Sequence, residues 1–286
     1  MNSLAANNSE DALSAVNALQ AEAERLYTPC GTGRMVWHAW GRGPTIVLLH
    51  GGAGSWRHWV RTIPALSQHY RVLAADMPGL GESDLPSEPW SLTVSADIIA
   101  AGIEQLLPQG ETFDLAGFSA GSIVSGLVAA RLGKRCHLLV LIGASALGTA
   151  RSPIVLEKVR GKQGQERRQS HATNLSRLMI ADPARIDDQA LAIQEWNSVH
   201  SRVNSVGFAE STLLRDAIEA SSAELKAIWG AEDAPAATSL EERCAVLRSL
   251  RPEVDIRIIP HAGHWVAYEA ADQFNNILVA MVNGAG

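Results

Sequence analysis

A pentapeptide with a central serine, Gly117-Phe118-Ser119-Ala120-Gly121, constrains the fold of this chain more than any other feature. A short apolar run, residues 112–116, precedes it, and an Ala-, Val- and Leu-rich stretch, residues 122–132, follows it. This order predicts a strand, a sharp turn and a helix, with the serine at the apex. Such a turn strains the serine backbone and needs small neighbours, so the hydroxyl stands above the sheet edge over a helix N-terminus.

A carboxylate suited to support Ser119 follows a later strand. Residues 223–229 read as a buried strand that leads into Glu232 and Asp233. A serine hydroxyl is a weak nucleophile until a base removes its proton, and that base needs an acid partner. We expect Asp233 to be the acid, with Glu232 as the alternative. The loop after the preceding strand, residues 143–148, has no carboxylate, which favours this choice.

A histidine completes the order serine, acid, histidine, which is typical of α/β-hydrolases. Residues 254–259 predict a strand, followed by His261 and His264. We expect His264 to deprotonate Ser119 and later to protonate the leaving group. His261 is the alternative, but Gly263 permits a close backbone approach beside His264, and a helix follows at once.

A glycine loop after another strand predicts an oxyanion hole. The apolar run at residues 45–49 reads as a strand buried on both faces, and His50-Gly51-Gly52-Ala53-Gly54 follows it. We expect the backbone N–H of Gly52, with Ala53 as the alternative, to pair with that of Ala120. His50 is expected to orient the loop. The glycine spacing does not match a phosphate-binding loop, and we expect no metal or other cofactor.

The combination resembles the α/β-hydrolase fold family, in which a D-x-P-G-x-G-x-S segment lies between the glycine loop and the serine turn. That segment reads Asp76-Met77-Pro78-Gly79-Leu80-Gly81-Glu82-Ser83 here, and the resemblance covers residues 30–284. A narrower similarity to meta-cleavage product hydrolases, which split carbon–carbon bonds in dienone acids, rests on five short motifs: His50-Gly51-Gly52, Leu141-Ile142-Gly143, Asp182-Pro183, Gly263-His264-Trp265 and Ala271-Asp272-Gln273-Phe274-Asn275.

Two positions differ from that subgroup. Its residue before the nucleophile is typically Asn and is Phe118 here, and its substrate-binding cap arginine would fall near Gln194. Arg177 and Arg202 are the alternative cations. We therefore expect a small apolar ester, thioester or lactone as substrate, with carbon–carbon hydrolysis as the alternative. A non-hydrolytic lyase, cofactor-free oxygenase or ligand receptor on the same fold is the second alternative.

Aromatic residues on the expected catalytic loops and lid predict an apolar pocket. The chain has eight tryptophans although aromatic residues make up only 5% of it. The residues expected to contact substrate are Phe118, Trp56, Trp196, Trp265 and Met179. Core packing is the alternative role for the tryptophans. Few charged groups are expected in this pocket.

Composition excludes several classes of partner. The net charge of −6 argues against nucleic acid, and no apolar run is long enough for a membrane span. Cys30, Cys136 and Cys244 have no metal-site spacing, so we expect free thiols in a reducing, cytoplasmic compartment. The expected partner is a small apolar molecule, with a homodimer as the further option.

Alternating strands and helices predict an α/β protein with a mostly parallel, doubly wound sheet. Residues 28–147 and 223–286 form the expected α/β-hydrolase core. Residues 148–222 lack a strand pattern, and we expect them to be a helical lid (cap) over the C-terminal sheet edge, where open α/β sheets bind ligands. Residues 1–27 are expected to be an N-terminal extension, disordered to about residue 10 and then helical. Residues 35–40 and 45–49 are expected to pair as a hairpin.

Overall fold

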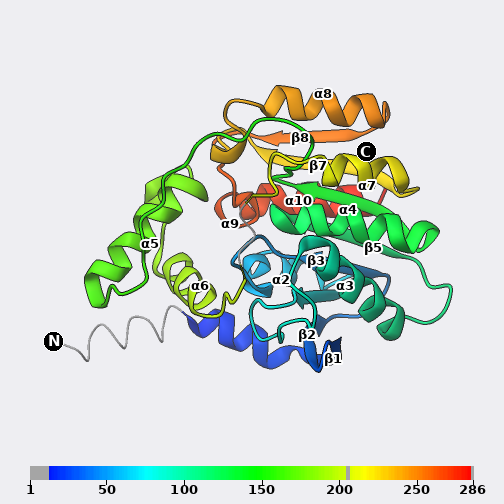
Figure 1. Cartoon of the computed structure of the whole chain (residues 1–286), viewed down its shortest axis with the longest axis horizontal. Coiled ribbons are helices and arrows are strands. Elements are labelled where there is room, and N and C mark those ends of the chain that lie inside the picture. Colours follow the sequence, from blue (N-terminus) through cyan, green and yellow to red (C-terminus); the bar gives the residue numbers. More distant parts are fainter. Residues whose placement is uncertain (1–12, 204–206, 285–286) are drawn as a thin grey trace.

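One eight-stranded sheet forms the centre of the molecule (Figure 1). The computed structural model describes residues 13–203 and 207–284. The strands lie in the order β1-β2-β4-β3-β5-β6-β7-β8, and β2 alone runs in the direction opposite to the other seven. The strands are β1 (Glu24–Cys30), β2 (Gly33–Trp40), β3 (Thr45–Leu49), β4 (Arg71–Asp76), β5 (Phe113–Phe118), β6 (Cys136–Ile142), β7 (Glu224–Gly230) and β8 (Asp255–Ile259).

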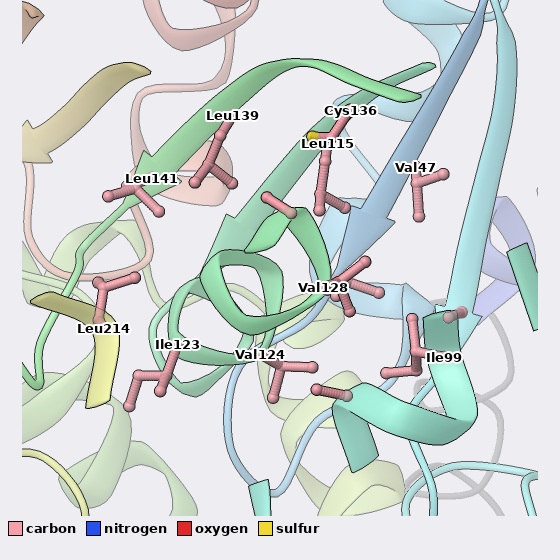
Figure 2. Close-up of a cluster of buried hydrophobic side chains, with 14 of the residues drawn as sticks. Val47, Ile99, Leu115, Ile123, Val124, Val128, Cys136, Leu139, Leu141 and Leu214 are labelled. Atoms are coloured by element: carbon pink, nitrogen blue, oxygen red, sulfur yellow. The ribbon is translucent and has the colours of Figure 1, made fainter. Parts of the chain in front are cut away.

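The central strands are buried on both faces, which explains their continuous apolar sequences. Side chains alternate between the faces along each strand. In β6, Leu139 and Leu141 belong to one core cluster, whereas Leu138 and Val140 belong to the other. Figure 2 shows the first cluster, in which strand side chains meet those of the helices on that face. The sheet therefore separates two apolar cores.

Helices cover both faces of the sheet. The first core receives α3, α4, α7 and α8, whereas the second receives α2, α5, α6, α9, α10 and the helix of residues 13–22. The helices are α2 (Ile63–Leu66), α3 (Leu92–Leu106), α4 (Ala120–Leu132), α5 (Gly164–Leu178), α6 (Asp188–Val199), α7 (Leu213–Ala220), α8 (Leu240–Leu250), α9 (Val266–Glu269) and α10 (Ala271–Val282), with short 3-10 turns η1 (Trp56–Trp59), η2 (Gly133–Arg135), η3 (Pro183–Arg185) and η4 (Ala234–Ala236).

The segment between β6 and β7 divides into two parts. Helices α5 and α6 pack against each other and form an arm beside the sheet in Figure 1. Helix α7, which was expected in the lid, packs instead against α4 on the sheet face. Leu214 is fully buried there, and its Cδ1 would lie 2.4 Å from a Cβ at Gly126. The amphipathic pattern of a sequence predicts a helix but does not reveal which surface that helix covers. Here the covered surface is α4.

Two further expectations about the N-terminal half are wrong. The residues of β2 and β3 do not form a hairpin, because β4 lies between them and pairs with both. The sheet begins at Glu24 rather than at residue 28, since β1 pairs with β2 along its whole length. The expected helix is present at residues 13–22. The expected disorder up to about residue 10 lies outside the described residues.

Cys30, Cys136 and Cys244 are buried free thiols. Over residues 13–203 and 207–284, none of the helices combines the length and apolar character that crossing a bilayer requires. The same residues contain no cluster of three or more His, Cys, Asp or Glu side chains suited to a metal ion.

Removing a side chain from the first core should lower the free energy of unfolding. Leu139 is 1% exposed, and Leu139→Ala should cost about 2–5 kcal/mol because a cavity remains. Val155 is 79% exposed, and Val155→Ala should change stability by less than about 0.5 kcal/mol. Urea unfolding of both variants measures the difference, and equal midpoints would contradict the assignment of Leu139 to the core.

Candidate active site

Ser119 lies in the turn between β5 and α4, in a backbone conformation that few residues adopt. Its φ is 54° and its ψ is −119°, a region that costs about 1–3 kcal/mol. The turn is so tight that a Cβ at Gly117 would lie 2.2 Å from Ser125 Oγ. A Cβ at Gly121 would lie 2.4 Å from the His50 carbonyl oxygen. Both glycines are therefore required by close approach, as the pentapeptide predicted.

Ser119, His264 and Asp233 form a chain of two hydrogen bonds. The Nε2 atom of His264 lies 2.9 Å from Ser119 Oγ, and its Nδ1 atom lies 2.7 Å from Asp233 Oδ2. Asp233 is 1% exposed and His264 is 4% exposed. The second carboxylate oxygen, Oδ1, accepts from the backbone N–H of Ala236, which fixes the carboxyl group. The neutral imidazole can donate from Nδ1 and accept from Nε2, the form that a general base needs.

The alternative histidine and acid, His261 and Glu232, lie outside this chain of hydrogen bonds. His261 has a side chain that is 93% exposed, and its Nδ1 lies 3.8 Å from Glu232 Oε1. The Glu232 side chain is 56% exposed. Both residues thus lie on the surface and do not contact Ser119. The structure brings together Ser119, Asp233 and His264.

Two buried histidines hold the glycine loop after β3. The Nε2 atom of His50 accepts from the Met77 N–H at 3.0 Å, so its Nδ1 carries the proton. This Nδ1 donates to the Gly51 carbonyl at 2.7 Å. The Gly51 N–H points to His58 Nδ1 at 3.3 Å. Because the bond from His50 fixes the carbonyl of the peptide that joins Gly51 to Gly52, it also sets the direction of the Gly52 N–H.

A cavity of about 250 Å³ lies above Ser119 and His264. The expected oxyanion donors Gly52 and Ala120, and the alternative Ala53, all border it. Ala120 is the first residue of α4, where N–H groups have no acceptor within the helix. The other side chains and backbone groups that line the cavity come from Gly51, Phe118, Ile123, Gly143, Ser145, Arg151, Leu156, Leu178, Met179, Gly207, Ala209 and Pro235.

The five residues expected to contact substrate divide into two groups. Phe118 and Met179 line the cavity. Trp56 and Trp265 do not, because they are buried in the second core at 0% and 1% exposure. Trp196 lies on α6, where it stacks on His200 and on the Arg57 guanidinium, away from the cavity lining. These three tryptophans therefore have the alternative role, which is packing.

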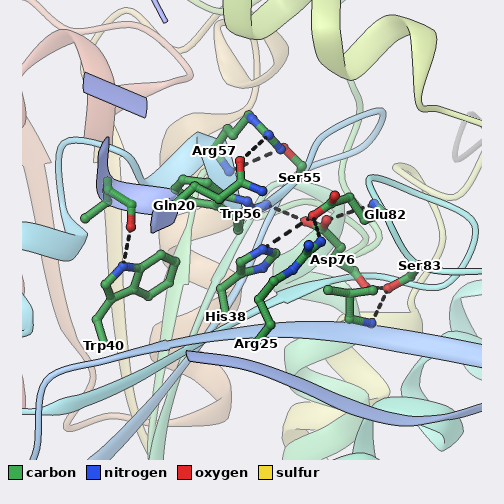
Figure 3. Close-up of polar contacts among 12 residues, drawn as sticks. Gln20, Arg25, His38, Trp40, Ser55, Trp56, Arg57, Asp76, Glu82 and Ser83 are labelled. Atoms are coloured by element: carbon green, nitrogen blue, oxygen red, sulfur yellow. Dashed lines mark hydrogen bonds and ion pairs between the residues drawn. The ribbon is translucent and has the colours of Figure 1, made fainter. Parts of the chain in front are cut away.

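The segment of residues 76–83 braces the start of η1 (Figure 3). The Asp76 carboxylate accepts from the N–H groups of Trp56 at 2.8 Å and Glu82 at 2.9 Å. The Ser83 hydroxyl donates to the Asp76 carbonyl and accepts from Val36 of β2 at 2.7 Å. Glu82 lies beside His38 and Arg25, which lower its pKa to about 2. The buried Asp76 and Ser83 contacts thus support the end of the loop that runs from Gly52 to η1.

Arg151 is a cavity residue that the sequence reasoning missed. It is the only Lys or Arg among the described residues that line the cavity. The cations considered instead are occupied elsewhere: Arg177 donates to the Val155 carbonyl, and Arg202 donates to the carbonyls of Gly81 and Ser83. Arg151 follows the loop at the carboxyl end of β6, the edge at which open α/β sheets bind ligands. Its position after the carboxyl end of this strand was the sequence feature that could have identified Arg151 as a cavity residue.

Residues 46–277 match the model of the alpha/beta hydrolase family. This chain belongs to that family. The chain is 32% identical over 165 residues to the pimeloyl-(acyl-carrier protein) methyl ester esterase of Aeromonas hydrophila, over 57% of this chain and 58% of that protein. The chain thus spans less than two thirds of the length of that relative.

A second relative aligns over nearly its whole length. The 2-hydroxy-6-oxo-6-phenylhexa-2,4-dienoate hydrolase of Burkholderia cepacia is 26% identical over 266 residues, which cover 85% of this chain and 90% of that protein. Among solved structures, the meta-cleavage product hydrolase CumD from Pseudomonas fluorescens IP01 superposes with a TM-score of 0.73 at 24% identity, over 93% of this chain and 100% of that chain. This last likeness shows the fold.

The free energy of unfolding should fall in mild acid. Burial lowers the pKa of His50, and burial with the neighbouring His50 and His264 holds the pKa of His58 well below its usual value. The unfolded chain takes up these protons near pH ~6.5 and the folded chain only at lower pH. The contribution of these neutral histidines to the free energy of unfolding is therefore fully present above pH ~6.5, and it is lost as the pH falls below that value.

Urea unfolding between pH 7.5 and 5 measures this slope. His58→Gln should flatten part of it, whereas His261→Gln at the exposed position should leave it unchanged. A wild-type midpoint that does not move over this range would contradict the burial of neutral histidines beside the glycine loop.

Proposed function

We propose that this protein is a serine hydrolase in which Ser119, His264 and Asp233 act as a catalytic triad. The observation that carries the proposal is the unbroken chain of hydrogen bonds from Asp233 to Ser119, which ends at the cavity. A carbonyl carbon placed above Ser119 Oγ would also lie beside the backbone N–H groups that border the cavity. These are the parts that acyl transfer requires.

In the proposed reaction, Ser119 Oγ attacks the substrate carbonyl carbon and its proton passes to His264 Nε2. Asp233 stabilises the imidazolium through the Nδ1–H bond. The N–H groups of Ala120 and Gly52, or Ala53 in place of Gly52, donate to the oxyanion. His264 then returns the proton to the leaving group, and a water molecule activated by the same histidine hydrolyses the acyl-enzyme.

The cavity walls favour a small ester, thioester or lactone with an apolar acyl group. Phe118, Ile123, Leu178 and Met179 supply apolar surface beside Ser119. Leu178 ends α5 and Met179 follows it directly, so we propose that α5 and α6 act as the cap over the site. The methyl ester esterase among the relatives has an activity of this class.

Carbon–carbon bond hydrolysis is the second candidate, and Arg151 is the observation that favours it. A dienone acid brings a carboxylate into the cavity, and that charge needs a cationic partner or loses several kcal/mol of hydration free energy. Arg151 offers such a partner, although Phe118 provides no hydrogen-bond donor beside the nucleophile. The dienoate hydrolase relative has this activity.

Ser119→Ala should remove covalent labelling by a fluorophosphonate probe and lower kcat by about 10⁴ to 10⁶-fold, because loss of a triad serine removes the nucleophile. His264→Gln should lower kcat by a similar factor. His261→Gln serves as the matched histidine control and should retain both labelling and turnover. Labelling that persists in Ser119→Ala would overturn the assignment of the nucleophile.

A short aryl ester should have a higher kcat/KM than a dienone acid, because the Arg151 guanidinium is only partly buried and Phe118 offers no polar contact. Arg151→Gln should change ester turnover less than threefold and should reduce any dienone acid turnover. Steady-state kinetics of wild type and Arg151→Gln with both substrates decide between the candidates. A dienone acid preferred by more than about tenfold, roughly 1.4 kcal/mol, would make carbon–carbon hydrolysis the function.

A further inference from the structure

The Glu269 carboxylate is buried and accepts hydrogen bonds from three backbone N–H groups. Glu269 ends α9 and is 3% exposed. Its Oε2 atom accepts from Gly263 at 2.7 Å and from Ala181 at 3.0 Å, and its Oε1 atom accepts from Asp182 at 2.8 Å. Three N–H donors compensate a carboxylate that has left water. The sequence reasoning gave this residue no role.

These bonds join two segments that are far apart in the chain. Gly263 directly precedes His264, whereas Ala181 and Asp182 follow the end of α5. Met179, on the cavity wall, belongs to the second segment, and its carbonyl accepts from the Trp265 N–H at 2.7 Å. Hydrogen bonds thus join the two segments on both sides of His264. Gly263 is linked through Glu269 to Ala181 and Asp182, and Trp265 is bonded directly to Met179.

The fit around Gly263 shows how closely the two segments approach. A Cβ at this position would lie 2.7 Å from the Ala181 nitrogen, 3.0 Å from Glu269 Oε2 and 3.1 Å from the Met179 carbonyl oxygen. Only glycine leaves room for the carboxylate to reach both N–H groups. The glycine before His264 therefore has a packing reason that is independent of its backbone angles.

We infer that Glu269 is a positioning residue. It holds His264 and the part of the cavity wall formed by Met179 in fixed positions relative to each other. The inference rests on the proposed function, in which His264 is the base. Glu269 contacts neither substrate nor the reacting atoms. Its carboxylate acts through the backbone on each side, fixing the direction of His264 toward Ser119 and the distance of Met179 from it.

The chemistry of the acceptor predicts which substitutions matter. A carboxylate presents lone pairs in all the directions that three N–H donors need, whereas a glutamine amide must turn its NH₂ group toward at least one of them. Glu269→Gln therefore breaks the link with little change of volume. Glu269→Asp keeps the charge but shortens the side chain by one methylene, so it should retain part of the link.

The first measurement is the second-order rate at which a fluorophosphonate labels Ser119. This rate reports the alignment of His264 and Ser119 and needs no knowledge of the natural substrate. We expect labelling to slow in the order wild type, Glu269→Asp, Glu269→Gln. The glutamine variant should lose on the order of 10²-fold, because small misplacements of a catalytic group cost that much.

The second measurement separates positioning from a general loss of stability. With p-nitrophenyl acetate, Glu269→Gln should lower kcat and leave KM near the wild-type value. With p-nitrophenyl octanoate, whose longer acyl chain is expected to contact Met179, KM should rise as well. Met179→Ala should raise KM for the octanoate in wild type and much less in Glu269→Gln, because the wall is already displaced.

Two controls match these variants. Glu111→Gln alters a carboxylate that accepts from the Thr45 hydroxyl at 2.9 Å, at the start of β3 and so at the other end of that strand from the glycine loop. Leu139→Ala supplies a folded variant that is less stable for reasons unrelated to the site. Both should label at the wild-type rate below their melting temperatures, and both should keep the full effect of Met179→Ala.

The outcomes distinguish the proposed function from the role of Glu269. Wild-type protein whose Ser119 is not labelled would overturn the proposed function itself. Labelled wild type together with Glu269→Gln and Glu269→Asp at the same rate would overturn only the role of Glu269. That role is also overturned if Leu139→Ala slows labelling as much as Glu269→Gln when each variant is assayed at the same interval below its own melting temperature. If Glu269→Gln does not fold, the Glu269→Asp rate and its KM for the octanoate carry the test.

Discussion

The left-handed turn at Ser119 is the constraint on which the rest of the site depends. A residue with φ of 54° and ψ of −119° reverses the chain within one residue, so that α4 starts directly against the end of β3. The contact of Gly121 with the His50 carbonyl follows from that geometry. It places the glycine loop and the first N–H of α4 at the same cavity. The local strain, about 1–3 kcal/mol, is held by the two apolar cores on either side of the sheet.

Each loop around this turn is fixed by a buried polar side chain bonded to the backbone of other segments. His50 holds the glycine loop, Asp76 holds η1, and Glu269 holds the segment before His264. Arg243, which is 0% exposed, does the same for the loops after β6 and β7. It donates to the Ala144 carbonyl at 2.8 Å and the Pro235 carbonyl at 3.1 Å, and burial lowers its pKa. Irregular loops leave backbone groups unpaired, and these side chains satisfy them.

Sequence predicted the parts of the molecule that local chemistry determines. The tight turn at Ser119 and the strands that precede Asp233 and His264 each have a local pattern, so their residues and order could be read directly. Long-range contacts have no such pattern. Whether β2 pairs with β3 or β4, and whether α7 covers α4 or the cavity, depends on packing between distant segments. Glu269 was missed for the same reason, since its three donors lie up to 88 residues away in the chain.

The substrate is harder to predict than the chemistry because opposing free energies of similar size meet in the cavity. Each methylene of an acyl chain buried against Leu178 and Met179 contributes about 0.8 kcal/mol. A charge-assisted hydrogen bond to Arg151 contributes about 1.5–3 kcal/mol, and desolvating the carboxylate costs several kcal/mol. Two or three buried methylenes therefore equal the ion pair before desolvation is counted. We therefore propose that the apolar walls favour a neutral ester. Exclusion of water by the proposed cap of α5 and α6 would strengthen the field of Arg151.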